Sequence, residues 1–196
     1  MSYSQIGQDI FVKQLFNSEG FFLDFGCGNG RNEPCGNNTL YLEENGWDGV
    51  SIDINENYVR NFNATRKTKA YAIDLTKVDI LEQLIDINCP KVIDYFSFDI
   101  DEATDNVLPR LPFDDFKFKF ITFEHNLYSP EYKLLKDYSV EIFKKNGYQF
   151  IFENVVLKGF GAVEDWYIHP DYFDFPCLGQ NVPYEEANNI LNKEKI

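Results

Sequence analysis

The chain has 196 residues, 44% of them hydrophobic, and a formal net charge of −14. This length and composition predict one folded domain with a sizeable core and argue against disorder. A nucleic-acid-binding protein needs a cationic footprint on the phosphates, so an acidic chain without a basic run argues against nucleic acid as a partner and favours a neutral or cationic ligand.

Short apolar runs alternate with helical patterns along the chain. Strands are predicted at residues 21–25, 49–53, 70–73, 92–98 and 118–123. Helices are predicted at residues 39–45, 56–65, 78–87, 103–111 and 131–145. Such alternation indicates an α/β fold with a parallel, doubly wound sheet that is covered on both faces. Two more strands, at 149–154 and 162–168, predict a hairpin at one sheet edge, and residues 171–196 predict a loop and a short terminal helix.

The sequence shows no stretch of about 18 apolar residues, so no membrane span is predicted. Its N-terminus lacks the basic and apolar regions of a signal peptide. The cysteines form no CxxC pair and have no zinc spacing, which favours free thiols in a reducing cytoplasm. They are Cys27, Cys35, Cys89 and Cys177.

Three glycines follow the first predicted strand, in the stretch "FFLDFGCGNG". Gly26, Gly28 and Gly30 permit positive φ and let a ligand approach the main chain at the carboxyl end of the sheet. The spacing is not the G-x-G-x-x-G that opens directly into a helix and binds a pyrophosphate. Asp24, just before the glycines, favours a cationic ligand without phosphates.

The stretch "LDFGCGNG" at residues 23–30 resembles motif I of the class I S-adenosylmethionine-dependent methyltransferases. Five segments in order, "SQIGQD", "FFLDFGCGNG…NNTLYLEENGWDGVSIDIN", "DYFSFDIDEAT", "FKFITFEHNLY" and "VEDWYIHPD", are similar to the FkbM-like methyltransferases. The resemblance implies a Rossmann-like fold with a mostly parallel seven-stranded sheet and an antiparallel edge strand. It also implies one domain over residues 1–196, with a cofactor-covering segment at 1–20 and an aromatic-rich segment at 162–196.

The resemblance assigns cofactor contacts. Asp53 is expected at the ribose hydroxyls and Asp74 at the adenine amino group, while Asp24 and the glycine backbone hold the amino-acid end. Asn38 and Thr39 are expected to cap the next helix, whose N-terminus then holds the methionine carboxylate. The full predicted set for S-adenosyl-L-methionine is Gln5, Asp24, Gly26, Cys27, Gly28, Asn38, Thr39, Asp53, Ile54, Asp74, Leu75 and Asp99.

The transferring methyl group is expected over the ends of the first and fourth strands. A base that removes a hydroxyl proton assists such a substitution, and His125, Asp99 and Asp101 are the candidates. Where family members often have D-x-E-G, this chain has Asp99-Ile100-Asp101-Glu102, so the roles of Asp101 and Glu102 rest on a partial match. A Mg²⁺ site formed by Asp99, Asp101 and Glu124 is an open alternative, although the prediction is an enzyme without metal.

The acceptor is expected against Glu102, Glu124, Trp166, Tyr167 and His169, because aromatic rings pack on sugar C–H faces and carboxylates bind hydroxyls. An aromatic core beneath the tail is the alternative. The resemblance implies O-methylation of a sugar in a glycan, with a 6-deoxyhexose such as rhamnose or fucose favoured. A small natural product as acceptor and a degenerate fold that only binds ligands are the alternatives, and a homodimer or a partner domain would complete the acceptor site.

Overall fold

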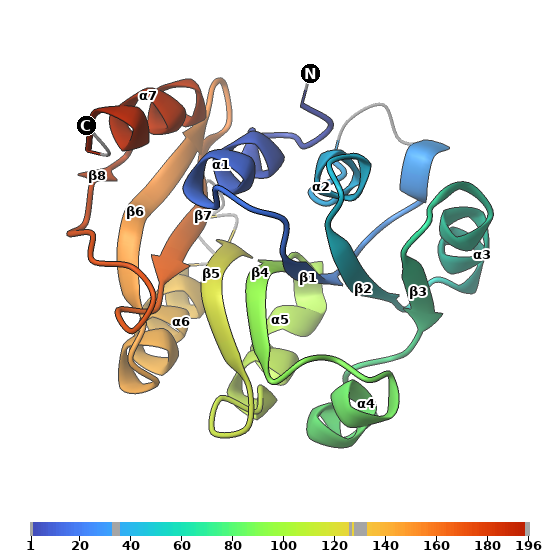
Figure 1. The fold of residues 1–196 in the computed structure, drawn as a ribbon. Coiled ribbons are helices and arrows are strands. Elements are labelled where there is room, and N and C mark those ends of the chain that lie inside the picture. The colour runs from blue at the N-terminus through green and yellow to red at the C-terminus, as the bar shows by residue number, and fades with distance from the viewer. Residues whose placement is uncertain (1, 33–35, 126, 128–132, 195–196) are drawn as a thin grey trace.

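A computed structural model describes residues 2–32, 36–125, 127 and 133–194. The described residues form one eight-stranded sheet in the order β3-β2-β1-β4-β5-β7-β6-β8 (Figure 1). The bounds are β1 Phe21–Phe25, β2 Asp48–Asp53, β3 Lys69–Ala72, β4 Val92–Phe98, β5 Lys117–Glu124, β6 Gln149–Leu157, β7 Gly161–Ile168 and β8 Gly179–Gln180.

The doubly wound sheet is confirmed, with a small correction to its edge. Strands β1 to β5 are parallel, and β7 runs antiparallel to both β5 and β6. The antiparallel strand β7 therefore lies inside the sheet, with β6 and β8 between it and the edge. The two-residue strand β8, parallel to β6, is the addition to the predicted seven strands.

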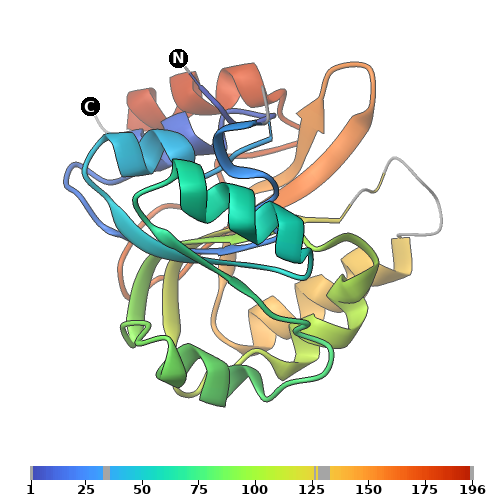
Figure 2. The same cartoon turned by 90° about the vertical axis from the view of Figure 1, so that its right-hand side faces the viewer.

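Helices cover both faces of the sheet, with α1, α2, α3 and α7 on one side and α4, α5 and α6 on the other (Figure 2). The bounds are α1 Gln8–Leu15, α2 Leu40–Glu44, α3 Glu56–Thr65, α4 Ile80–Asp86, α5 Thr104–Val107, α6 Lys133–Lys145 and α7 Tyr184–Glu194. The described residues also form three short 3₁₀ helices, η1 Gly30–Asn32, η2 Asp101–Ala103 and η3 Leu108–Arg110. No described helix has the length and apolar character that a membrane span requires.

Helix α1 is absent from the sequence prediction, and the predicted helix 103–111 consists of η2, α5 and η3 in succession. Helix α3 has the predicted bounds, and Asn55 caps its start, because the Asn55 side chain accepts hydrogen bonds from the N–H groups of Asn57 and Tyr58. Cys35 and the first two residues of the predicted helix 131–145 lie outside the described residues.

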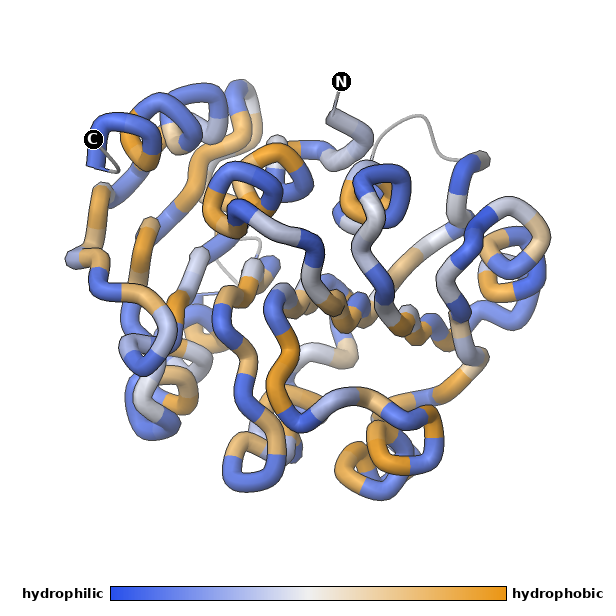
Figure 3. The backbone as a smooth tube through the Cα atoms, viewed as in Figure 1, coloured by the Kyte–Doolittle hydropathy of each residue, from blue (hydrophilic) through white to orange (hydrophobic). Residues whose placement is uncertain are grey.

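Strand alternation builds a separate core on each face. In β1, Phe22 packs with the α1 side, whereas Leu23 and Phe25 pack with α4, α5 and α6. Burying one such side chain stabilises the fold by roughly 1.5–3 kcal/mol. Figure 3 shows the helices with both hydrophobic and hydrophilic residues, as expected for helices that bury one face. Asp24 shares the α1 side of β1 with Phe22.

The order in which strands are added to the sheet reverses at β1. The chain leaves β1 for β2 on one side, while β4 pairs with β1 on the other. Ligands bind at such a switch point, outside the carboxyl ends of the strands. The glycine loop, residues 26–30, begins there.

Candidate active site

A cleft of about 440 Å³ lies at the carboxyl ends of β1 to β4. This volume is within the range of small-molecule sites. Its walls combine loop backbone, acids and apolar side chains from four strand ends. The lining residues are Gly26, Gly28, Gly36, Asp53, Ile54, Asn55, Tyr58, Ile73, Asp74, Leu75, Thr76, Asp99, Ile100, Asp101 and Ala103.

The glycine loop is left-handed at three positions, with φ of 84° at Gly26, 60° at Gly28 and 65° at Gly30. A Cβ on Gly26 would lie 1.6 Å from the carbonyl oxygen of Asp99, and one on Gly30 would lie 2.9 Å from Cα of Phe62. Two of the predicted glycines therefore also permit close packing of the loop on its own chain.

Asp53 stands at the end of β2 and faces the loop. Its Oδ2 accepts a hydrogen bond from the N–H of Gly28 (3.0 Å), and its Oδ1 accepts one from the N–H of Asn55 (2.8 Å). These two bonds fix the carboxylate, and each oxygen keeps a further acceptor site. A carboxylate held in this way suits two adjacent hydroxyls.

Asp74 lies beyond the end of β3 and also lines the cleft. Its carboxylate pairs with Lys77 (2.8 Å to Nζ) and accepts hydrogen bonds from the hydroxyl (2.6 Å) and N–H of Thr76. These contacts, with Lys77 first, lower the pKa of Asp74 to about 2. Asp74 is therefore an ionised acceptor at neutral pH.

A buried polar layer lies behind the glycine loop. Asp24 is 3% exposed, and its Oδ2 accepts a hydrogen bond from the Thr39 hydroxyl (3.0 Å). Burial raises the pKa of Asp24 to about 6, against the effect of Thr39. Asn38 donates to the hydroxyl of Ser97 (3.0 Å). Asp24, Asn38 and Thr39 thus support the loop from within and do not line the cleft.

The predicted helix cap is corrected by one or two positions. Neither Asn38 nor Thr39 caps α2; the Asn37 side chain does so by accepting hydrogen bonds from the N–H groups of Thr39 (3.3 Å) and Leu40 (2.9 Å). The tripeptide "NNT" contains three residues that can cap, so sequence alone does not choose among them.

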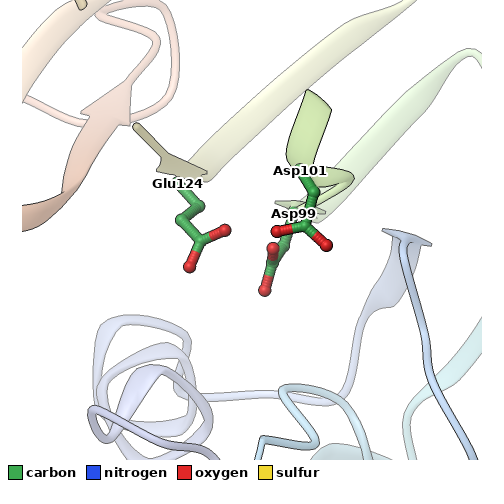
Figure 4. Close-up of side chains that lie close together, drawn as sticks. All are labelled: Asp99, Asp101 and Glu124. Carbon is green, nitrogen blue, oxygen red and sulfur yellow. The ribbon is translucent and has the colours of Figure 1, made fainter. Parts of the chain in front are cut away.

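Three carboxylates converge beside the cleft. Asp99 and Asp101 follow β4, Glu124 ends β5, and the three side chains point into one space (Figure 4). Their closest oxygens all lie within 4.8 Å of one another. Burial and then Glu124 raise the pKa of Asp99 well above its usual range, and burial followed by Glu124 also raises that of Asp101. We call Asp99, Asp101 and Glu124 the acid cluster.

Glu164, which sequence analysis missed, stands opposite Glu124 in the β5–β7 ladder. It is 5% exposed and accepts hydrogen bonds from Gln8 (2.6 Å) and the Trp166 indole (2.7 Å). Burial raises its pKa to about 8. The residue lies in the quoted segment "VEDWYIHPD", but its contact with Gln8 depends on packing between distant parts of the chain, which a local pattern does not predict.

His125 lies behind the acid cluster, in a buried polar group with Asp165 and Lys136. Its Nδ1 accepts a hydrogen bond from the N–H of Leu127 (3.1 Å), and its Nε2 is 3.5 Å from Asp165. The residue is 1% exposed and does not line the cleft. This placement favours a structural role, which corrects the expectation that His125 is a base in contact with the acceptor.

The predicted aromatic wall is corrected as well. Trp166 and Tyr167 are fully buried, Trp166 against Phe11 (ring centroids 4.7 Å apart) and Tyr167 against Phe143 (4.4 Å). His169 follows β7 at the end of the sheet opposite the cleft, where its N–H donates a hydrogen bond to the carbonyl of Lys119. These positions favour the alternative that the sequence left open, an aromatic core.

The other predicted residues differ in exposure. Gln5 and Glu102 are exposed, and neither lines the cleft. Cys27 is 2% exposed, and burial raises the pKa of its thiol. Gly26, Gly28, Asp53, Ile54, Asp74, Leu75 and Asp99 all line the cleft as the cofactor prediction requires. The cleft is also lined by Asn55, Tyr58 and Thr76, which the sequence did not predict. The only feature of the sequence that points to them is that they follow strand ends.

The family model for tellurite resistance protein TehB matches residues 9–108, which is just over half of the chain. A search of curated proteins finds no match. The matched range contains the cleft-lining residues.

Solved structures share the fold at low identity. A TehB-like S-adenosylmethionine-dependent methyltransferase from Corynebacterium glutamicum has 14% identity and a TM-score of 0.55 over 83% of this chain and 87% of that one. Magnesium protoporphyrin IX methyltransferase from Synechocystis, with S-adenosylmethionine bound, has 12% identity and a TM-score of 0.56 over 83% and 76%. A protein from Pyrococcus horikoshii has 16% identity and a TM-score of 0.52 over 85% and 94%.

Proposed function

The chain belongs to the TehB family, and we propose that it is an S-adenosylmethionine-dependent O-methyltransferase that acts on a sugar hydroxyl. The observation that carries the cofactor assignment is the cleft. Left-handed glycines form one wall, and the acids that follow β2 and β3 form another. A site of this kind holds a nucleoside by its hydroxyls and base while the backbone approaches closely.

The residues present fit S-adenosylmethionine. Asp53 accepts hydrogen bonds from the ribose hydroxyls, and the ionised Asp74 accepts one from the adenine amino group. Ile54, Ile73 and Leu75 supply apolar surface for the adenine ring. No Lys or Arg lines the part of the cleft that the structure describes, which suits a cationic ligand.

When bound, the cofactor supplies an electrophilic methyl group on a sulfonium. The protein's task is then to exclude water, orient the acceptor and take up the hydroxyl proton. Asp99 is the proposed base, because it lines the cleft and because burial and then Glu124 raise its pKa well above its usual range, which makes the ionised carboxylate a stronger base. Asp101 stands beside it and is exposed enough to meet an acceptor.

A sugar acceptor rests on the FkbM-like motifs and on carboxylates suited to hydroxyl groups. Asp101 and Glu124 supply such oxygens near the proposed base, and Glu102 follows Asp101 in η2. A 6-deoxyhexose such as rhamnose or fucose is the favoured acceptor. A small natural product is the second candidate, because a fold shared with enzymes such as the porphyrin methyltransferase does not choose the acceptor.

The test measures S-adenosylhomocysteine formation by the purified protein on two panels, one of rhamnosides, fucosides and other monosaccharides, the other of small hydroxylated natural products. The expected result is turnover on a deoxyhexoside with methyl transfer to one hydroxyl. Turnover only on the second panel would replace the acceptor class. Cofactor binding without turnover on either panel would favour a binding module.

A further inference from the structure

Arg66 is a buried cation outside every sequence motif used above. It is the first residue after α3, and its side chain is 0% exposed. The guanidinium lies over the ring of Phe62, with 4.4 Å from its central carbon to the ring centroid. Arginine is almost never fully buried without partners, so its contacts indicate what it is for.

Three residues from α2 and the segment before it meet the guanidinium. Its Nε is 3.1 Å from the Glu43 carboxylate. Its Nη1 donates a hydrogen bond to the Asn37 side-chain oxygen (3.0 Å), and its Nη2 donates one to the Thr39 hydroxyl (3.2 Å). The planar fork of donors is suited to holding separate acceptors in fixed directions.

These contacts continue to both ends of the glycine loop. The Thr39 hydroxyl donates to Asp24, which precedes the loop, and the Asn37 side-chain amide donates to the carbonyl of Gly30, where the loop ends (3.1 Å). Asn37 also follows Gly36 directly, and the backbone of Gly36 lines the cleft. One cation is thus joined to the loop through two side chains.

We propose that Arg66 is a positioning residue for the cofactor: through Asn37 and Thr39 it holds the glycine loop in the shape that the cofactor meets. The inference rests on the proposed function, since it assumes that the cleft holds S-adenosylmethionine. Arg66 itself does not line the cleft, so its effect is expected on affinity and on loop order.

Arg66→Lys keeps a positive charge for Glu43 but cannot donate to Asn37 and Thr39 in the same geometry. Thr39→Val removes the hydroxyl between Arg66 and Asp24 with little change of shape. Both are expected to bind S-adenosylhomocysteine at least tenfold more weakly than the unchanged chain. Arg60→Lys is the matched control, because Arg60 lies on the exposed side of α3.

The experiment combines calorimetric titration with S-adenosylhomocysteine and amide hydrogen exchange on the four proteins. Weaker binding and faster exchange over residues 26–32, with exchange in α6 unchanged, are expected for Arg66→Lys and Thr39→Val only. If Arg66→Lys does not fold, Thr39→Val decides. Wild-type affinity in folded Thr39→Val, or exchange that rises equally across the chain, would overturn the inference. No binding by the unchanged chain would instead overturn the proposed function.

Discussion

The backbone N–H of Gly28 donates a hydrogen bond to Oδ2 of Asp53 over 3.0 Å, which joins the glycine loop to the end of β2. The same carboxylate accepts from Asn55 at the start of α3. Asp53 therefore organises two walls of the cleft while it presents oxygen atoms to a ligand. Its loss affects both the contact and the shape of the site.

Replacing Asp53 with alanine is expected to weaken S-adenosylhomocysteine binding by about 10²-fold, because charge-assisted hydrogen bonds contribute roughly 1.5–3 kcal/mol each. Asp48→Ala, at the opposite end of β2, is the control and is expected to leave affinity unchanged. Calorimetric titration measures both. Unchanged affinity in Asp53→Ala would remove the ribose assignment.

Gly26→Ala tests the packing of the glycine loop. The new Cβ would lie 1.6 Å from the carbonyl oxygen of Asp99, at a residue with φ of 84°. We expect a loss of about 3 kcal/mol or more of unfolding free energy, because the clash adds to the left-handed strain. Gly159→Ala has φ of 90° and no atom within 4 Å of the new Cβ, so a loss of about 1–2 kcal/mol is expected. Urea denaturation measures both, and equal losses would contradict the clash.

Lys136→Met tests the buried ion pair behind the active site. Its Nζ lies 2.6 and 2.7 Å from the two carboxylate oxygens of Asp165, which is 0% exposed. Removing the cation leaves a buried charge, and a loss of about 3–5 kcal/mol is expected in urea denaturation. The control is Lys77→Met, which breaks an exposed pair with Asp74 and is expected to cost at most about 1 kcal/mol. A similar small loss in both variants would contradict the assignment.

The residues that line the cleft are more predictable from the sequence than the buried residues around it. The apolar runs that end at Asp53 and Asp99 predict strand ends, and parallel strands place their carboxyl ends together. The glycine spacing predicts the backbone wall. These features depend on short-range pattern and on chain direction, and Gly26, Gly28 and Asp74, which the sequence predicts as cofactor contacts, line the cleft.

Features that depend on side-chain packing were not predictable in the same way. Trp166 and Tyr167 alternate along β7, but both faces of this strand are covered, so alternation does not expose either ring. Arg66 and Glu164 contact residues that are distant in the sequence. The hydrogen bond from Gln8 to Glu164 joins residues 156 positions apart, and no local pattern predicts such a contact. His125 follows a strand end, as a base would, yet its ring turns toward Asp165.

We predict an enzyme without metal, which interprets the acid cluster as carboxylates that share a proton. Three carboxylates with oxygens within 4.8 Å of one another cannot all ionise easily, which agrees with the raised pKa of Asp99 and Asp101. Methyl transfer is expected to persist in EDTA. Titration with MgCl₂ at neutral pH is expected to show no binding. Activity that EDTA removes and Mg²⁺ restores would make Asp99, Asp101 and Glu124 metal ligands instead.

The identity of the base is tested by the pH dependence of kcat. Because Asp99 acts only when ionised, kcat is expected to rise with pH through its pKa, which burial and Glu124 hold well above the usual range. Asp99→Asn is expected to lose about 10²-fold or more in kcat at unchanged cofactor affinity. Glu124→Gln removes the negative neighbour, so the pKa of Asp99 falls and the limb moves to lower pH. His125→Ala is expected to keep the position of the limb, since its ring does not line the cleft. A limb that disappears in His125→Ala and is unmoved in Glu124→Gln would assign the proton to the histidine.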